Sequence, residues 1–285
     1  MSEIITLKVP YEKFQCKKDD FVATLTVVEE TVRNIRPAVI VCPGGAYFFK
    51  CDREGMPVAR AFAKAGMAAF LLDYSVTPNR FPAALLEVAQ SILYVRQHAE
   101  QYNVNPDKII VCGFSAGGHL AASIGTMWHQ SFLWKALGTT KEMICPQGII
   151  LCYPVITTGK YTHIDSCVNL LGYENYKDLV AGNTSNQETS DVLKSVSIEK
   201  QITANTPPAF IWTTFDDDLV PMENSLLFVE AMRKEKIPVE FHLFPHGIHG
   251  LSLATRDISA LPDGQDVSDA VQIWFSMALR WIEGL

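Results

Sequence analysis

The chain has 285 residues, of which 48% are hydrophobic and 19% charged, and its formal net charge is −7. This composition excludes a disordered chain, because it supplies enough apolar side chains for a large core. Lysine and arginine are scattered, so no basic cluster predicts nucleic-acid binding. No apolar run approaches the roughly 20 residues that a membrane-spanning helix needs, and we expect no membrane association.

The cysteines and the N-terminal residues indicate a reducing compartment. The seven cysteines form no C-x-x-C pair, and Cys42, Cys112 and Cys152 lie within apolar runs. Such cysteines are typical of small buried hydrophobic side chains rather than of disulfides, metal ligands or nucleophiles. The N-terminal sequence MSEIITLKVPYEKF lacks the apolar stretch of a signal peptide. We therefore expect a cytoplasmic protein without a metal site.

Short apolar and β-branched runs alternate along the chain with longer helical patterns. The first two runs, Ile5–Val9 and Phe21–Glu29, alternate apolar with polar residues, as strands at an antiparallel edge do. Six more runs predict strands: Ala38–Cys42, Ala68–Tyr74, Ile109–Gly113, Gly148–Tyr153, Ala209–Thr214 and Val239–Phe244. Most of these are apolar throughout, which indicates strands covered on both faces.

Apolar residues at spacings of three and four predict helices between these strands. The clearest cover Pro57–Ala65, Pro82–Tyr102, Met222–Lys234 and Val267–Trp281. Alternation of strands and helices with buried strands predicts an α/β fold, in which helices flank a mainly parallel sheet of about eight strands. The length suits a single domain over residues 1–285.

One segment departs from this alternation. Residues 156–206, between two predicted strands, are polar and rich in Asn, Thr and Ser. A long irregular excursion inside a compact domain is commonly functional, as a lid or cap. We therefore expect a small, partly helical cap here rather than a plain surface loop.

Residues 109–119, IIVCGFSAGGH, contain the pattern G-x-S-x-G around Ser115. A predicted strand precedes it and a predicted helix follows, which is the context of a nucleophile elbow. In so tight a turn the serine backbone is strained, and side chains two residues before and after would clash, so glycine suits positions 113 and 117. We expect Ser115 to be a nucleophile, with the helix N-terminus favouring negative charge beside it.

A serine nucleophile needs a histidine as general base and a carboxylate that orients it, and in this fold the chain order is serine, acid, histidine. The acid candidates are Asp216, Asp217 and Asp218, directly after one late predicted strand. The base candidates are His246 and His249, after the next strand. We favour Asp217 and His249, with Asp216 and His246 as their rivals.

The carbonyl oxygen that gains negative charge during acyl transfer needs preorganised N–H donors. One should be the N–H of Ala116, next after the nucleophile, and the others should come from the loop PGGAY after an early strand. The glycines of this loop let the backbone approach a substrate closely. We expect Gly45 and Ala46 as further donors, and Tyr47 and Phe48 as residues that shape the substrate pocket.

Six segments occur in a characteristic order: PGGAY, DREG, FPAALLE, GFSAGGHLAAS, DDDLVPMENSL and HGIHGLSLA. With them the chain resembles the esterase/lipase branch of the α/β-hydrolase superfamily, and especially the carbohydrate esterases related to acetyl-xylan esterase. The resemblance covers nearly the whole chain. It implies the α/β-hydrolase fold, Ser115 as nucleophile, His249 as base and Asp217 as orienting acid. Asp217 stands three residues before Val220, where the D-x-x-V-P loops of such enzymes place the acid.

The resemblance also implies short-chain ester substrates, acetylated sugars among them, and no cofactor. The expected partner is a small-molecule ester, and a homodimer is an option because related enzymes often dimerise. Many relatives carry His-Gly-Gly-Gly where this chain has PGGA at residues 43–46. Backbone donors survive that change, although the acyl pocket can differ in shape. Arg53 is expected in a surface salt bridge rather than against a polar group of the substrate.

Two other functions are compatible with the same residues. A serine peptidase of the oligopeptidase type shares the triad order, but such enzymes usually carry an extra gating domain. A non-catalytic ligand-binding protein on this fold typically lacks a triad residue, and all three candidates are present here. Ester hydrolysis that depends on Ser115 would favour an esterase over these two functions.

Overall fold

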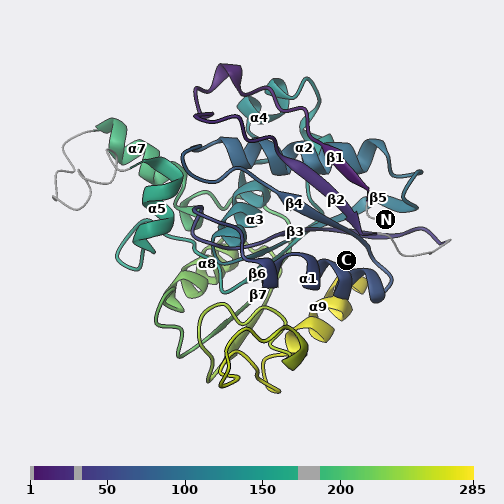
Figure 1. The fold of residues 1–285 in the computed structure, drawn as a ribbon. Helices are drawn as coiled ribbons and strands as arrows, with labels where there is room; N and C mark the ends of the chain where they lie inside the picture. The colour runs from purple at the N-terminus through teal and green to yellow at the C-terminus, as the bar shows by residue number, and fades with distance from the viewer. Residues whose placement is uncertain (1–2, 29–33, 173–186) are drawn as a thin grey trace.

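The computed structural model describes residues 3–28, 34–172 and 187–285, with only the backbone of residues 187–190. In this part of the chain eight strands form one sheet in the order β1-β2-β4-β3-β5-β6-β7-β8 (Figure 1). The strands are β1 (Ile4–Thr6), β2 (Thr24–Val28), β3 (Arg36–Cys42), β4 (Ala68–Asp73), β5 (Val104–Phe114), β6 (Gly148–Cys152), β7 (Ala209–Thr214) and β8 (Val239–Phe244). β2 pairs antiparallel with β1 and β4, and every later pair is parallel. The predicted parallel sheet with an antiparallel edge is confirmed.

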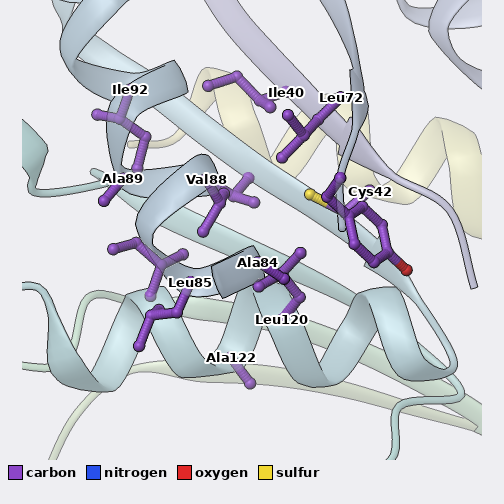
Figure 2. Close-up of a cluster of buried hydrophobic side chains, with 14 of the residues drawn as sticks. Ile40, Cys42, Leu72, Ala84, Leu85, Val88, Ala89, Ile92, Leu120 and Ala122 are labelled. Carbon is purple, nitrogen blue, oxygen red and sulfur yellow. The ribbon is translucent and has the colours of Figure 1, made fainter. Parts of the chain in front are cut away.

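Helices cover both faces of the sheet. One face packs against α2 (Ala83–Gln97), α3 (Ala116–Met127) and α8 (Glu223–Lys234), and the other against α1 (Met56–Lys64) and α9 (Ile273–Glu283). Figure 2 shows side chains of α2 and α3 meeting Ile40, Cys42 and Leu72 in the first of these cores. Short 3₁₀ helices cover Tyr11–Lys13, Asp52–Glu54, Lys141–Ile144, Ile198–Lys200 and Arg256–Ile258, and α4 covers Ser131–Ala136.

Burial on both faces explains the apolar sequence of the central strands. Successive side chains of a strand point to opposite faces. In β3, Ile40 and Cys42 belong to the core under α2 and α3, whereas Val39 and Val41 belong to the core under α1 and α9. Because neither set of side chains meets water, no polar alternation is needed. Cys42, Cys112 and Cys152 are buried and free, as predicted.

The described part of the segment at 156–206 includes the helices α5 (Ile164–Leu171) and α7 (Gln187–Ser195), at the left of the view in Figure 1. Residues 173–186 of the expected cap, like Glu29 of the second predicted strand, lie outside the described residues. The described part of the segment is tied back to the domain, since the Phe81 N–H donates to the carbonyl oxygen of Leu170. Among the described residues, no helix is both long and apolar enough to cross a membrane.

Candidate active site

Ser115 lies on the turn between β5 and α3, with φ of 51° and ψ of −117°. Such a backbone conformation costs a residue with a side chain about 1–3 kcal/mol. A Cβ at Gly113 would collide with the carbonyl oxygen of Gly117, and a Cβ at Gly117 with that of Cys42. The Ser115 N–H donates to the carbonyl oxygen of Cys152 in β6 over 3.0 Å. The tight turn therefore needs both glycines, as the sequence predicted.

His249, on the loop after β8, contacts both Ser115 and Asp217, which lies on the loop after β7. Its Nε2 is 2.9 Å from Oγ of Ser115, and its Nδ1 is 2.7 Å from Oδ2 of Asp217. An ionised carboxylate only accepts, so we assign the proton to Nδ1, which leaves Nε2 to accept from the Ser115 hydroxyl. The side chains of His249 and Asp217 are 12% and 0% exposed. Little water competes for these contacts, and the arrangement can pass a proton from the hydroxyl to the imidazole.

The carboxylate of Asp217 is fixed by its own loop. Its second oxygen, Oδ1, accepts the backbone N–H groups of Leu219 at 3.1 Å and Val220 at 2.9 Å. These bonds hold Oδ2 toward His249. The position three residues before Val220 thus has a geometric reason, because the turn after β7 folds the Val220 N–H back onto the acid.

The rival residues form a pair of their own at the surface. Nδ1 of His246 lies 2.7 Å from Oδ2 of Asp216, but these side chains are 84% and 48% exposed. Asp218 is exposed as well. In the described part of the chain, the Ser115 hydroxyl donates to His249 and not to a residue of this pair.

The loop after β3 passes beside the serine and carries two of the expected N–H donors. A Cβ built on Gly44 would lie only 2.9 Å from Cβ of Ser115. Gly45, Ala46 and Tyr47 have φ of 125°, 55° and 55°, so three successive residues lie in the left-handed region. Among the described residues, the N–H groups of Gly45, Ala46 and Ala116 donate to no protein atom. They are free to donate to a substrate oxygen.

Tyr47 and Phe48, expected to shape the pocket, differ in exposure at 3% and 65%. Oη of Tyr47 lies 2.8 Å from Nδ1 of His119, whose Nε2 lies 2.8 Å from the carbonyl oxygen of Val196. A carbonyl only accepts, so Nε2 carries the proton and the Tyr47 hydroxyl donates to Nδ1. Burial lowers the pKa of His119 to about 4, which keeps this imidazole neutral near pH 7.

Sequence reasoning missed two residues that hold the loop beside Ser115. Nδ2 of Asn169, on α5, donates to the carbonyl oxygen of Ala46 at 2.9 Å. Oε2 of the buried Glu54 accepts the N–H of Gly44 at 2.7 Å. No pattern marks Asn169. Glu54 lies within DREG, one of the segments that carry the resemblance, and that was the one signal available.

Comparison with known proteins identifies the family. The BD-FAE family model matches residues 27–232. Endo-1,4-beta-xylanase B of Butyrivibrio fibrisolvens is 39% identical over 230 residues, which are 78% of this chain and 33% of that protein. The acetylxylan esterase of Xylanibacter ruminicola is 32% identical over 222 residues, which are 76% of this chain and 42% of that protein. The chain thus spans less than half the length of these two curated relatives.

A solved structure extends the likeness to the whole fold. The acetyl ester-xyloside bifunctional hydrolase from Caldicellulosiruptor lactoaceticus superposes with a TM-score of 0.81 at 32% identity, covering 99% of this chain and 96% of that one. Because the family model matches more than half of the chain and the sheet has the expected order, the chain belongs to the BD-FAE family and is an α/β-hydrolase related to esterases.

Proposed function

We propose that this protein is a serine carboxylesterase that hydrolyses short-chain, acetyl-type esters, with acetylated sugars as a candidate substrate class. Ser115 is the nucleophile, His249 the general base and Asp217 the orienting acid. One observation carries the proposal: two short contacts, of 2.9 Å and 2.7 Å, link the serine hydroxyl through the imidazole to a buried carboxylate. A serine hydroxyl is a weak nucleophile until such a base removes its proton.

In the first half-reaction, His249 takes the proton of Ser115 while Oγ bonds to the carbonyl carbon of the ester. The electron pair of the C=O bond moves to the oxygen, which accepts hydrogen bonds from the N–H groups of Gly45, Ala46 and Ala116. Each such donor lowers a barrier of this kind by about 3–4 kcal/mol. When the C=O bond re-forms, the ester C–O bond breaks and the imidazolium protonates the leaving alkoxide.

In the second half-reaction, water replaces the alcohol. His249 takes a proton from the water while the water oxygen attacks the acyl carbon. The carbonyl oxygen again becomes negative and accepts hydrogen bonds from the same N–H groups. The bond to Oγ then breaks, Ser115 regains its proton from the imidazolium, and the carboxylic acid leaves. Asp217 holds the imidazole in one tautomer and stabilises its charged form in both halves.

Two observations support a short acyl group. A hollow with a volume of about 10 Å³, roughly one water molecule, lies between Tyr47 and residues 155–170. Tyr47 and Val155 line it, and the Val155 N–H donates to the carbonyl oxygen of Ser115. The second observation is the sequence similarity to a relative that is an acetylxylan esterase. A hollow of this size suits an acetyl group better than a long acyl chain.

The remaining features of the proposal concern the whole chain. We place residues 1–285 in a single α/β-hydrolase domain, with residues 156–206 as a cap over the site. The hydrogen bonds of α5 to Ala46 and of Val196 to His119 support this placement of the cap. A homodimer and a cytoplasmic location stay predictions from the sequence.

Covalent labelling tests the nucleophile. Diethyl p-nitrophenyl phosphate should release one equivalent of p-nitrophenolate and leave a diethylphosphoryl group on Ser115, identified by peptide mass spectrometry. The Ser115→Ala variant should not react. Ser123→Ala, which changes a buried serine in the same helix α3, is the matched control and should react like the wild type. Labelling of Ser115→Ala at the wild-type stoichiometry would contradict the assignment.

A further inference from the structure

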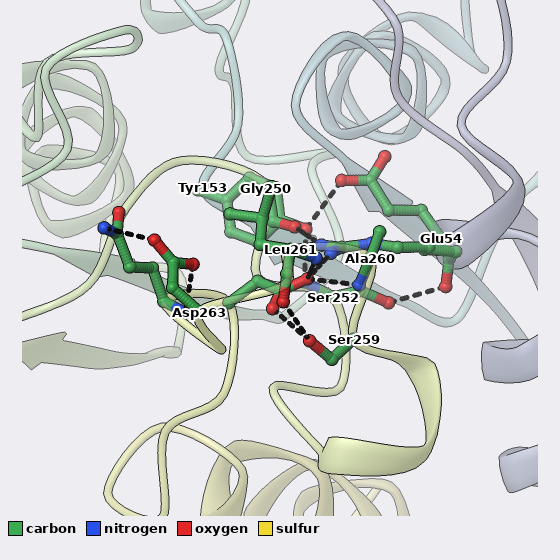
Figure 3. Close-up of polar contacts among 11 residues, drawn as sticks. Glu54, Tyr153, Gly250, Ser252, Ser259, Ala260, Leu261 and Asp263 are labelled. Atoms are coloured by element: carbon green, nitrogen blue, oxygen red, sulfur yellow. Dashed lines mark hydrogen bonds and ion pairs between the residues drawn. The ribbon is translucent and has the colours of Figure 1, made fainter.

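Glu54 is a buried carboxylate that joins the two loops on either side of Ser115. Its Oε2 accepts the N–H of Gly44, in the loop of the expected oxyanion donors, at 2.7 Å. Its Oε1 accepts the hydroxyl of Tyr153 at 2.7 Å, and the Tyr153 oxygen in turn accepts the N–H of Ser252 at 2.8 Å. Figure 3 shows this path from Glu54 through Tyr153 to Ser252, which lies three residues after His249. Gly44, Glu54, Tyr153 and Ser252 are all buried.

Arg53, the residue before Glu54, also contacts the loop that carries His249. The guanidinium of Arg53 donates to the carbonyl oxygen of Gly250, next to His249, and pairs with Asp266. The hydroxyl of Ser252 donates back to the carbonyl oxygen of Arg53 at 2.7 Å. The expected ion pair of Arg53 is confirmed, but its expected surface position is wrong, because the Asp266 side chain is fully buried.

Tyr153 also brings the carboxylate close to the imidazole. Its ring meets the His249 ring edge-on, with centroids 5.0 Å apart and an interplanar angle of 71°. Burial raises the pKa of Glu54, and the Tyr153 hydroxyl, the charge of His249, the Gly44 N–H and Arg53 act in the opposite direction. A buried carboxylate is costly unless donors and a nearby positive charge favour it. Both carboxylate oxygens of Glu54 accept hydrogen bonds, as an ionised carboxylate does, and the imidazolium of His249 forms beside it.

We propose that Glu54 is a positioning residue for ester hydrolysis, which sets the oxyanion loop through Gly44 and the His249 loop through Tyr153, and whose negative charge stabilises the imidazolium. This inference rests on the proposed function, because it assigns a role within the same reaction. It differs from the role of Asp217, which contacts the imidazole directly. Glu54 acts through the backbone of the loop after β3, at Gly44, and through Tyr153, which directly follows β6.

The test compares Glu54→Gln with Glu87→Gln. Glu87 is a matched control, because it is also fully buried and also accepts a tyrosine hydroxyl, of Tyr11, and a backbone N–H, of Ser75, both at 2.6 Å. Its partners lie outside the candidate active site. Glutamine keeps the size of glutamate and removes its charge. The difference between the two variants therefore reports on the place of Glu54 in the site.

For Glu54→Gln we expect kcat for p-nitrophenyl acetate to fall on the order of ten- to a hundredfold, with KM changed by less than about threefold. Loss of a negative charge near the base favours its neutral form. The acidic limb of the kcat/KM profile should therefore move to lower pH, by about half a unit or more. Glu87→Gln should keep kcat within about twofold and leave the limb in place, even if its melting temperature falls. Among the described residues, the other titratable groups around this carboxylate and imidazole are Asp217, Arg53, His163, Tyr153, Cys51, Tyr74 and Cys152.

An unchanged kcat and an unmoved acidic limb in folded Glu54→Gln would overturn the inference. If this variant does not fold, Tyr153→Phe carries the test, because it cuts the link to Ser252 and leaves the Gly44 contact. A lowered kcat at unchanged KM supports the inference, and a wild-type kcat overturns it. Failure of the proposed function is a separate result, since the wild type would then show no hydrolysis that depends on Ser115.

Discussion

The side-chain amide of Asn169 donates a hydrogen bond of 2.9 Å to the carbonyl oxygen of Ala46. The two residues are 123 positions apart and belong to different parts of the fold, since Asn169 lies on α5 and Ala46 on the loop beside Ser115. Ala46 is held with φ of 55°, where a residue with a side chain is disfavoured. The segment at 156–206 thus fixes a peptide unit of the expected oxyanion loop.

This contact predicts that Asn169→Ala lowers kcat for p-nitrophenyl acetate by about three- to tenfold, because one hydrogen bond that orders the N–H donors is lost. KM should change little. Asn205→Ala is the matched control, an exposed asparagine in the same segment, and should behave like the wild type. A kcat for Asn169→Ala within twofold of the wild type would show that α5 does not set the loop.

The two acid–histidine pairs predict opposite results for neighbouring aspartates. Asp217→Asn should lower kcat by a factor on the order of 10³–10⁴. Its amide oxygen would accept from the N–H groups of Leu219 and Val220, so its NH₂ group would face Nδ1, and the neutral amide would not stabilise the imidazolium. Asp216→Asn should stay within about twofold, because its histidine partner is exposed and does not contact Ser115. Steady-state kinetics with p-nitrophenyl acetate give kcat for both variants and so decide between the two aspartates. A collapse of kcat in Asp216→Asn alone would reverse the assignment.

The crowded elbow predicts a large stability loss for Gly113→Ala. The new Cβ would meet the carbonyl of Gly117, so the turn would have to shift, at about 3 kcal/mol of unfolding free energy or more. Gly138→Ala is the control, because Gly138 has φ of 64° but no atom within 4 Å of its Cβ position. It should cost only about 1 kcal/mol. Urea denaturation measures both, and equal losses would speak against the clash.

The buried His119 predicts a loss of stability in mild acid. Its pKa in the folded protein is about 4, below the value of about 6.5 for an unperturbed histidine, so the unfolded chain binds the additional proton between these pH values. Its contribution to the unfolding free energy therefore falls as pH falls from 6.5 to 4, by up to about 1.4 kcal/mol per pH unit.

The His119 contribution is isolated by comparison with His119→Gln, because other buried groups titrate in the same range. Urea denaturation of both proteins between pH 4 and pH 7 should give a shallower dependence on pH for the variant. Equal slopes would mean that His119 is not held neutral by burial. The Tyr47 hydroxyl would then not donate to Nδ1, because a charged imidazole carries a proton on both ring nitrogens.

Much of the fold follows from the sequence because burial and periodicity are local signals. β7 and β8 have the predicted bounds, since both strands are flanked by clear turns and pair along their full length. The predicted helix at Val267–Trp281 begins only at Ile273 in the structure. Asp266 explains the difference, because its carboxylate accepts the N–H groups of Ala260 and Leu261 and pairs with Arg53, which keeps this stretch in a loop.

The same contrast holds in the site. Ser115, Asp217 and His249 were selected from strand ends and chain order, and the structure brings these three side chains together. The sequence does not indicate Glu54 and Tyr153 as a pair, because 99 residues separate them and each has an ordinary sequence context. Only the packed tertiary structure shows that a buried carboxylate spans the two loops. Periodicity reports which face is buried, but not which polar group is buried with it.

The most direct test of the account is the hydrolysis of p-nitrophenyl acetate and p-nitrophenyl octanoate by the purified protein and by Ser115→Ala. We predict rapid turnover of the acetate, at least about tenfold higher kcat/KM than for the octanoate, and loss of turnover by a factor on the order of 10³ or more in the variant. Turnover that survives Ser115→Ala, or no turnover of any ester by the folded wild type, would contradict it.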